Sequence, residues 1–119
     1  MIVLDSGVIL RYLLADDEKL HKKAKEIIEK ESCLVLPEIL AEVVVSLEVL
    51  YKVPREDLSA VLVEFLNFDN IHIPDEYIRA LFLYGQKEIS FLEAVLCAYG
   101  KDRKVATFSK RLKKFLKES

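Results

Sequence analysis

The sequence contains no tryptophan, and its 119 residues include only three glycines, three prolines and two cysteines. Because 52% of the residues are hydrophobic, this scarcity of chain breakers indicates a compact, helix-rich globular protein and excludes a disordered binding segment. The two cysteines, Cys33 and Cys97, stand apart within apolar runs. Disulfide frameworks and cysteine metal sites need cysteines in larger number or in close pairs, so we expect two reduced, buried thiols.

Long hydrophobic runs are also missing from the chain. No run approaches the roughly 20 residues of a membrane-spanning helix, and the N-terminus lacks the basic region and cleavage site of a signal peptide. Met1 is followed directly by an apolar run that begins a structural element. We therefore expect a cytoplasmic protein with no membrane segment, and the length predicts a single domain over residues 1–119.

Apolar runs and cap signals alternate along the chain. Four short runs are predicted as buried strands, at residues 2–4, 33–36, 71–73 and 104–108. Helices are expected between them, at residues 8–14, 17–30, 37–52, 54–66, 75–85, 90–99 and from Ser109 onward, with Asp16 or Asp17 and then Asp75 as caps and Gly85 as a terminator. This alternation predicts a three-layer α/β/α domain whose central, mainly parallel sheet has about four strands.

Several polar residues follow the predicted strands, where open parallel sheets bind their ligands. Asp5 ends the first strand, and Glu42 lies one turn into the helix after the second strand. Glu93 lies in the first turn of its own helix, and Ser109 follows the fourth strand. If the sheet forms as predicted, these side chains converge on one cleft.

Asp5 and Glu42 each have a structural alternative. Asp often starts a turn, but a carboxylate at the end of a buried strand is a costly place for a mere turn former, which favours a functional Asp5. Glu42 interrupts an apolar helix, where a buried charge needs a cation or a metal. The alternative for Glu42 is an exposed stripe shared with Glu38 and Ser46, and the sequence leaves both interpretations open.

The structural alternatives are stronger for the other two positions. Ser90-x-x-Glu93 is a capping box, in which Glu at the third helical position binds back to the backbone of the cap. The capping box alone would account for Glu93. Ser109 likewise needs no function beyond capping the last helix.

Charge is distributed unevenly along the chain, although the net charge is only −2. The last twenty residues contain eight Lys or Arg against Asp102 and Glu118, while the preceding 99 residues carry an excess of eight acidic side chains. A basic end on an acidic body can mark a nucleic-acid or partner surface. The alternative is a solvated helix face, and charge alone favours that alternative.

Other chemistries lack the residues they require. A glycine-rich phosphate-binding loop is absent, and phosphatases with a strand-end Asp nucleophile need a second Asp where this chain has Gly7. His21 lies among lysines, and His72 lies in mid-strand with no Cys or second His nearby. Neither histidine indicates a metal site or a catalytic base.

Four motifs, in the expected order and intervals, resemble the PIN domain and, within it, the small VapC-like toxins of bacterial and archaeal toxin–antitoxin pairs. The first, MIVLDSGVILRYLL, is similar to the opening strand, Asp-Thr-Asn turn and first helix of the family. The second is LPEILAE, which ends in Glu42. The third and fourth, SFLEAVL and VATFS, lie where the family has Ser-Phe-x-Asp-Ala and a Thr-Phe-Asp strand end.

The resemblance implies an endoribonuclease in which acids bind Mg²⁺ or Mn²⁺ and the metal activates a water that cleaves RNA. It implies Asp5 and Glu93 as catalytic metal ligands, and Glu42 as a ligand or water-orienting base, with Ser6 and Ser109 in support. It also implies an RNA substrate, a small antitoxin protein as partner and a homodimer. The basic residues expected to contact RNA are Arg11, Lys110, Arg111, Lys113 and Lys114.

The chain departs from the family pattern at three positions. Gly7 replaces the Asn of the turn, Glu93 replaces Asp and is one methylene longer, and Ser109 replaces the fourth acid. Mg²⁺ demands near-octahedral geometry at about 2.1 Å, so a longer ligand is not a neutral change. The alternative function is therefore a PIN module that binds RNA or a partner protein without cleaving RNA.

Overall fold

A computed structural model describes residues 1–118 of the chain. Three two-residue strands, β1 (Ile2–Val3), β2 (Cys33–Leu34) and β3 (Ile71–His72), form one parallel sheet in the order β1-β2-β3. Cys33 of the central strand pairs with Ile2 on one side and with Ile71 on the other. The mainly parallel sheet is therefore confirmed, with three strands in place of about four.

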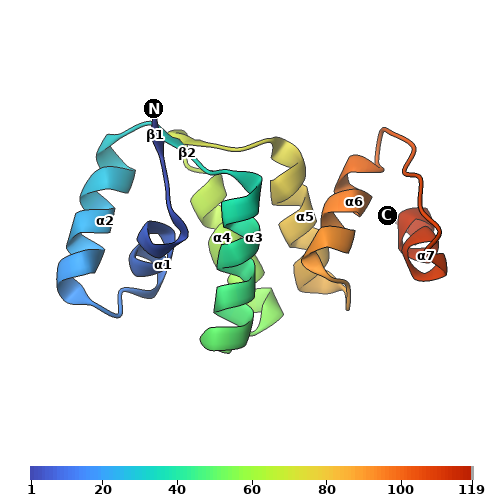
Figure 1. The fold of residues 1–119 in the computed structure, drawn as a ribbon, viewed down its shortest axis with the longest axis horizontal. Coiled ribbons are helices and arrows are strands. Elements are labelled where there is room, and N and C mark those ends of the chain that lie inside the picture. The colour runs from blue at the N-terminus through green and yellow to red at the C-terminus, as the bar shows by residue number, and fades with distance from the viewer. Residues whose placement is uncertain (119) are drawn as a thin grey trace.

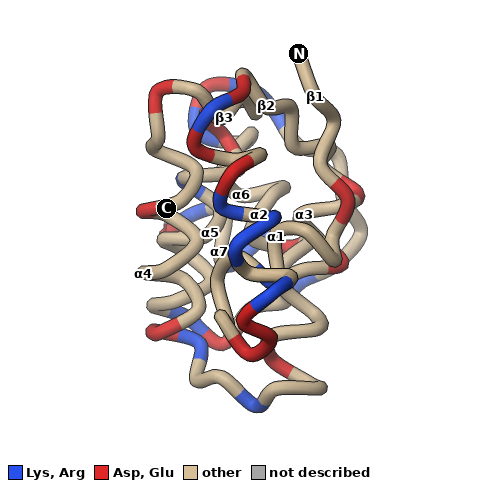
Figure 2. Tube along the Cα trace, turned by 90° about the vertical axis from the view of Figure 1, so that its left-hand side faces the viewer, with Lys and Arg blue, Asp and Glu red and all other residues tan. Residues whose placement is uncertain are grey.

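Helices make up most of the described chain: α1 (Ser6–Leu14), α2 (Glu18–Lys30), α3 (Pro37–Val45), the π-helical turn η1 (Ser46–Leu50), α4 (Arg55–Leu66), α5 (Asp75–Gln86), α6 (Phe91–Tyr99) and α7 (Lys110–Glu118). The molecule measures 47 × 30 × 18 Å, and the helices follow one another along its long axis from α2 and α1, through α3 and α4, to α5, α6 and α7 (Figure 1). The view along that axis shows α3 and α4 on opposite sides, as in the predicted layers (Figure 2). None of the described helices has the length and apolar composition needed to span a bilayer.

The core is centred on β2 and the inner faces of the helices. Cys33 and Val35 are fully buried, and α4 contributes Leu58 and Leu62 at helical spacing. Both cysteines are buried and form no disulfide within residues 1–118, as predicted. Cys33 and Val35 share the buried face of the central strand, and Leu34 on its other face is half-buried, so an apolar run was the expected signal.

The strand predictions are wrong in two respects, the burial of the first strand and the existence of a fourth strand. The run at residues 2–4 was expected to be a buried strand, but Ile2 and Val3 are 37% and 55% exposed because β1 is an edge strand, and only Leu4 is buried. Residues 104–108 do not form a fourth strand. They lie in the connection between α6 and α7, at the other end of the long axis from β1, and so have no strand to pair with (Figure 1).

The helix caps were predicted better than the helix ends. Asp17 caps α2 by accepting a hydrogen bond from the backbone N of Leu20 at 2.9 Å. Gly85, expected to end α5, lies inside it, and a glycine is needed there because a Cβ would stand 2.7 Å from the Cβ of Ser59 on α4. The expected cap Asp75 is instead the first residue of α5, after Pro74.

Candidate active site

Asp5 follows β1 and is the N-cap of α1. Its Oδ1 accepts a 2.8 Å hydrogen bond from the backbone N of Ser6, and its carbonyl accepts from Val8 and Ile9. Asp5 therefore has a structural role, the capping of α1, although the sequence favoured a functional one. Its second carboxylate oxygen makes no hydrogen bond or ion pair within residues 1–118, and the side chain is exposed. That oxygen is free to bind a ligand.

Glu42 lies in α3 on an exposed stripe. Leu40, Val43 and Val44 turn into the core, whereas Glu42 and Glu38 face solvent. The structure therefore supports the exposed-stripe interpretation over a buried charge. Neither oxygen of Glu42 has a hydrogen-bond or ion-pair partner in the described part of the chain, so this carboxylate is also available.

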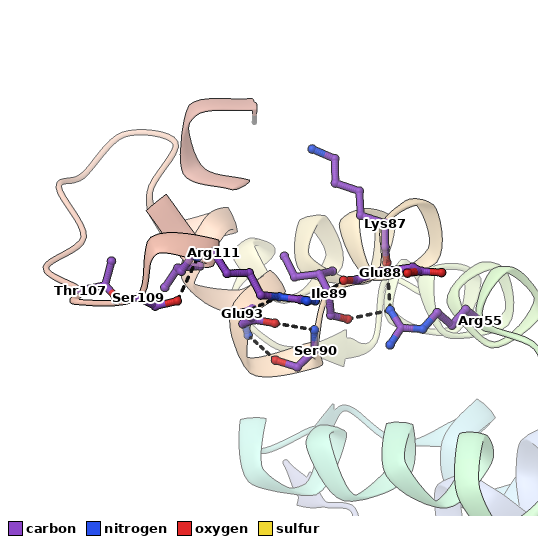
Figure 3. A network of polar contacts seen from close by, with 10 residues as sticks. Arg55, Lys87, Glu88, Ile89, Ser90, Glu93, Thr107, Ser109 and Arg111 are labelled. Atoms are coloured by element: carbon purple, nitrogen blue, oxygen red, sulfur yellow. Dashed lines mark hydrogen bonds and ion pairs between the residues drawn. The ribbon is translucent and has the colours of Figure 1, made fainter. Parts of the chain in front are cut away.

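Glu93 is fully engaged by protein groups (Figure 3). The capping box is confirmed: Ser90 Oγ accepts from the backbone N of Glu93 at 3.1 Å, and Glu93 Oε1 accepts from the backbone N of Ser90 at 2.9 Å. The other oxygen, Oε2, lies 3.3 Å from Nε of Arg111. Arg111 also donates through Nη2 to the carbonyl of Glu88. Both oxygens of Glu93 are therefore occupied.

These contacts act on the ionisation of Glu93. The hydrogen bond from the Ser90 backbone holds the pKa of the Glu93 carboxyl below its ordinary value, and partial burial opposes this shift. The Ser90 hydroxyl and Arg111 lower the pKa further. Glu93 is thus a carboxylate at neutral pH whose charge is already satisfied within the protein.

The two serines assigned supporting roles have structural ones. Ser109 caps α7, because its Oγ accepts a 3.0 Å hydrogen bond from the backbone N of Leu112. Its own backbone N donates to Oγ1 of Thr107 at 3.1 Å. Ser6 is buried, and its backbone N holds the carboxylate of Asp5.

The basic residues expected to contact RNA differ in their surroundings. Arg11 is held at the end of α1, where Nη2 donates to the hydroxyl of Tyr51 at 2.8 Å and Nε lies 3.0 Å from Oδ1 of Asp16. The contact between Arg11 and Asp16 is a close ion pair and not an aligned hydrogen bond. On α7, three exposed lysines make no ion pair with any described residue: Lys110, Lys113 and Lys114. At the α2 end of the molecule, both basic and acidic positions occur along the helix (Figure 2).

Arg55 was missed by the sequence reasoning. Its Nη1 donates to the carbonyls of Tyr84, Lys87 and Ile89 at 3.2, 2.9 and 2.6 Å. Its guanidinium lies 3.9 Å from the centre of the Tyr84 ring. These bonds fix the turn that leads into α6 and so position Glu93. An arginine in the first turn of a helix opposes the helix dipole, which was the one sequence signal available.

A pocket of about 450 Å³ lies beside this turn. It is lined by Arg55, Glu88, Ile89, Ser90, Glu93 and Arg111. A larger pocket of about 930 Å³ lies along α5, and neither Asp5 nor Glu42 lines it. We consider the smaller pocket the relevant one, because it contains a candidate catalytic carboxylate between two arginines.

The carboxylates have suitable chemistry for a hard divalent cation, but their placement does not fit one. Oxygen ligands at about 2.0–2.6 Å must surround such an ion together. Within residues 1–118, no group of three or more His, Cys, Asp or Glu side chains is close enough to hold a metal. Asp5 and Glu42 offer free oxygens, whereas Glu93 is turned to Arg111 and Ser90. The structure thus presents the candidate residues without assembling them.

Comparison with known proteins identifies the class. The model of the PIN domain family matches residues 2–115, so the chain belongs to the PIN domain family. A VapC ribonuclease from Aquifex aeolicus (strain VF5) is 30% identical over 123 residues, which cover 96% of this chain and 91% of that relative. No solved structure matches the chain. The resemblance seen in the four motifs is confirmed.

Proposed function

We propose that the chain is a toxin-type endoribonuclease that depends on Mg²⁺ or Mn²⁺. The observation that carries this proposal is the family match over residues 2–115, together with a relative of nearly equal length that is a ribonuclease. Metal binding would give a function to the carboxylate oxygens of Asp5 and Glu42 that have no hydrogen-bond or ion-pair partner within the described chain. A cytoplasmic location and a small antitoxin partner belong to the same proposal.

Metal dependence requires a local rearrangement. Carboxylate oxygens are the ligands that hard cations prefer, but Glu93 must leave Arg111 before Oε2 can join the other two acids. In that ion pair Arg111 is exposed and Glu93 is half-buried, and ion pairs near the surface contribute only about 0.2–1 kcal/mol. Breaking this ion pair therefore costs little, but the three acids must also approach one another, because they form no metal-binding group among the described residues.

The alternative is a PIN module that binds RNA or a protein partner without cleavage. One observation favours it: no metal-binding group forms among residues 1–118, and Glu93 is held by its cap and by Arg111. The two functions differ in whether RNA is cut, because a module that binds RNA would retain it intact and a module that binds only a protein would not touch it.

The deciding experiment is incubation of the purified chain with labelled RNA in Mg²⁺ or Mn²⁺, with and without EDTA. The proposed function predicts internal cleavage products that disappear when EDTA is present. Matched DNA of the same sequence tests whether the activity is specific for RNA, and Asp5→Asn protein purified in parallel controls for contaminating ribonuclease. Binding of RNA without cleavage, in either metal, would support the module and contradict the ribonuclease.

A further inference from the structure

Arg111 supplies the positive charge beside Glu93 (Figure 3). Its Nε lies 3.3 Å from Oε2 of Glu93, and its Nη2 donates to the carbonyl of Glu88. Its guanidinium also lies 5.3 Å from the centre of the Phe115 ring, one turn further along α7. The carboxylate that the family motif assigns to a metal is therefore neutralised by a side chain of the same chain.

Arg111 is exposed enough to change partners. Its side chain is 59% exposed, whereas that of Glu93 is 23% exposed. The contacts with Glu93 and Glu88 involve two of its five N–H groups, and the others have no partner among residues 1–118. A planar guanidinium with free donors can bind a phosphate at two points. Arg111 therefore has the chemistry of a phosphate-binding residue as well as that of a partner for Glu93.

The lysines of α7 lie where they can bring a phosphate chain to Arg111. Lys114 follows Arg111 by three residues, so the two side chains are neighbours on the helix surface. Lys110 is a neighbour of both Lys113 and Lys114 by the same rule, which makes one basic face. All three lysines are exposed and make no ion pair with a described residue. Arg111 therefore borders this face and contacts Glu93 from it.

Glu93 and a phosphate would compete for Arg111. Two anions in contact with the same guanidinium repel each other, so sharing is unfavourable. Ion pairs near the surface are weak, and giving up the pair with Glu93 would lower RNA affinity by no more than about fivefold. Each phosphate contact releases counterions from the nucleic acid, and several such contacts exceed that loss. RNA that binds along the basic face can therefore take Arg111 from Glu93.

We infer that Arg111 is a positioning residue that exchanges Glu93 for a phosphate of the RNA backbone. Without RNA, Arg111 holds Oε2 of Glu93 and keeps that oxygen unavailable. With RNA along α7, Arg111 turns to the phosphate, while Oε1 of Glu93 still accepts from the backbone N of Ser90. Oε2 is then free, as one oxygen of Asp5 is. This exchange deepens the proposed function, and it rests on RNA as the substrate and not on cleavage.

The first test is RNA affinity without divalent metal, measured by fluorescence anisotropy of labelled single-stranded RNA in EDTA. Glu93→Gln keeps the capping box, since Gln also serves there, but it gives up the ion pair with Arg111. Glu88→Gln is the matched control, because it removes the same charge from the same pocket and its carbonyl still accepts from Arg111. Exchange predicts that Glu93→Gln binds RNA about two- to fivefold more tightly than Glu88→Gln. Equal affinities, or weaker binding by Glu93→Gln, would overturn the inference.

The second test asks whether the gain in affinity depends on Arg111. Each glutamine variant is combined with Arg111→Met, and RNA affinity in EDTA is measured again. Exchange predicts equal affinities in this background, because no guanidinium remains to be released. A difference that persists would show that Glu93 repels RNA directly, and it would overturn the exchange. Thermal unfolding of each variant in parallel verifies that the compared proteins are folded.

The third test uses the wild-type chain and so does not depend on a variant being stable. NMR resonances of the Nε–H group of Arg111 and of the carboxyl carbon of Glu93 are followed as RNA is added in EDTA. Exchange predicts that both resonances shift together, because the two groups separate. RNA binding that leaves either resonance unchanged would contradict the exchange.

Cleavage of RNA in Mn²⁺ is measured separately, so the exchange and the proposed function fail in different ways. Cleavage without a difference between Glu93→Gln and Glu88→Gln would remove the exchange and leave the ribonuclease. The difference without cleavage would support the exchange and favour the module that binds RNA. A wild-type chain that binds no RNA in EDTA would overturn the exchange.

Discussion

The two sides of the candidate site differ in what their carboxylates bind. Beside the sheet, Asp5 keeps one free oxygen and Glu42 keeps two within the described chain. At the start of α6, both oxygens of Glu93 are used, by the Ser90 backbone and by Arg111. The comparison teaches that two acids are available for function, while the third serves as part of the fold. Mutations on the two sides should therefore have different consequences.

The largest effect is expected at Asp5. Asp5→Asn keeps a good N-cap but removes the negative charge from a side chain that has a free oxygen beside the sheet. Loss of metal-dependent charge stabilisation is worth several kcal/mol, so we expect RNA cleavage to fall at least about 100-fold with the melting temperature nearly unchanged. Cleavage kinetics and thermal unfolding would be measured together. Asp69→Asn, at an exposed turn, is the control, and a fully active Asp5→Asn enzyme would break the comparison.

On the α6 side, mutation should instead change stability. Ser90→Ala removes the hydroxyl that accepts from the Glu93 backbone, and loss of such a cap costs about 1 kcal/mol of unfolding free energy. Ser90→Thr retains the cap and should stay close to wild type. Denaturant titration provides the measurement. If Ser90→Ala were as stable as wild type, the capping box would not explain Glu93.

The ionisation of Glu93 adds a pH dependence to this side. Its folded-state pKa lies below the ordinary value of 4.5, so its charge stabilises the fold above that pH and the contribution is lost as pH falls through the folded pKa. The stability difference between wild type and Glu93→Gln should therefore shrink as the pH falls from above 4.5 through the folded-state pKa. Glu26→Gln on α2 is the control. A difference that grows at low pH would contradict this account.

Substitution of Arg111 should make Glu93 resemble the two available acids, Asp5 and Glu42. Arg111→Met leaves Oε2 of Glu93 free, and we expect Mn²⁺ to bind up to about fivefold more tightly, since an exposed ion pair is worth at most about 1 kcal/mol. Lys114→Met removes the same charge from the same helix without touching Glu93. Isothermal titration of both variants would separate a specific release from a general charge effect. Equal affinities would mean that Arg111 does not restrain the site.

The smallest effect concerns the basic face of α7. If Lys110, Lys113 and Lys114 contact the RNA backbone, affinity should fall with salt at a slope of about 0.7 per phosphate contact. Reversing two of these charges should lower the slope by about 1.4. Fluorescence anisotropy at several salt concentrations measures it. An unchanged slope would leave α7 as a solvated helix face.

The sequence predicted those parts of the fold that depend on residues close together in the chain. The buried run around Cys33 and the caps at Asp17 and Ser90 depend on neighbouring residues, and the structure confirms them. The strand predicted at residues 104–108 has the right apolar alternation but no partner. Strand formation depends on a paired edge, which a single segment of sequence cannot reveal. The assignment of one domain to residues 1–119 stays a prediction.

The candidate site was predicted only in part for the same reason. The sequence identified Asp5, Glu42 and Glu93 from their positions after strands and from the motifs. It did not identify Arg111 as the partner of Glu93, because that pair joins residues in different helices and depends on how α7 packs. It missed Arg55 because the three carbonyls it binds belong to a turn about thirty residues away.

The central proposal is that Asp5 and Glu42 bind a divalent cation when the protein acts on RNA, and that Glu93 joins them only after it leaves Arg111. The most direct measurement is the line broadening that Mn²⁺ causes in the amide NMR resonances of the full chain. The account predicts selective broadening around Asp5, Glu42 and Glu93, and loss of that broadening in Asp5→Asn. Broadening around other acids alone, or none at saturating Mn²⁺, would contradict the claim.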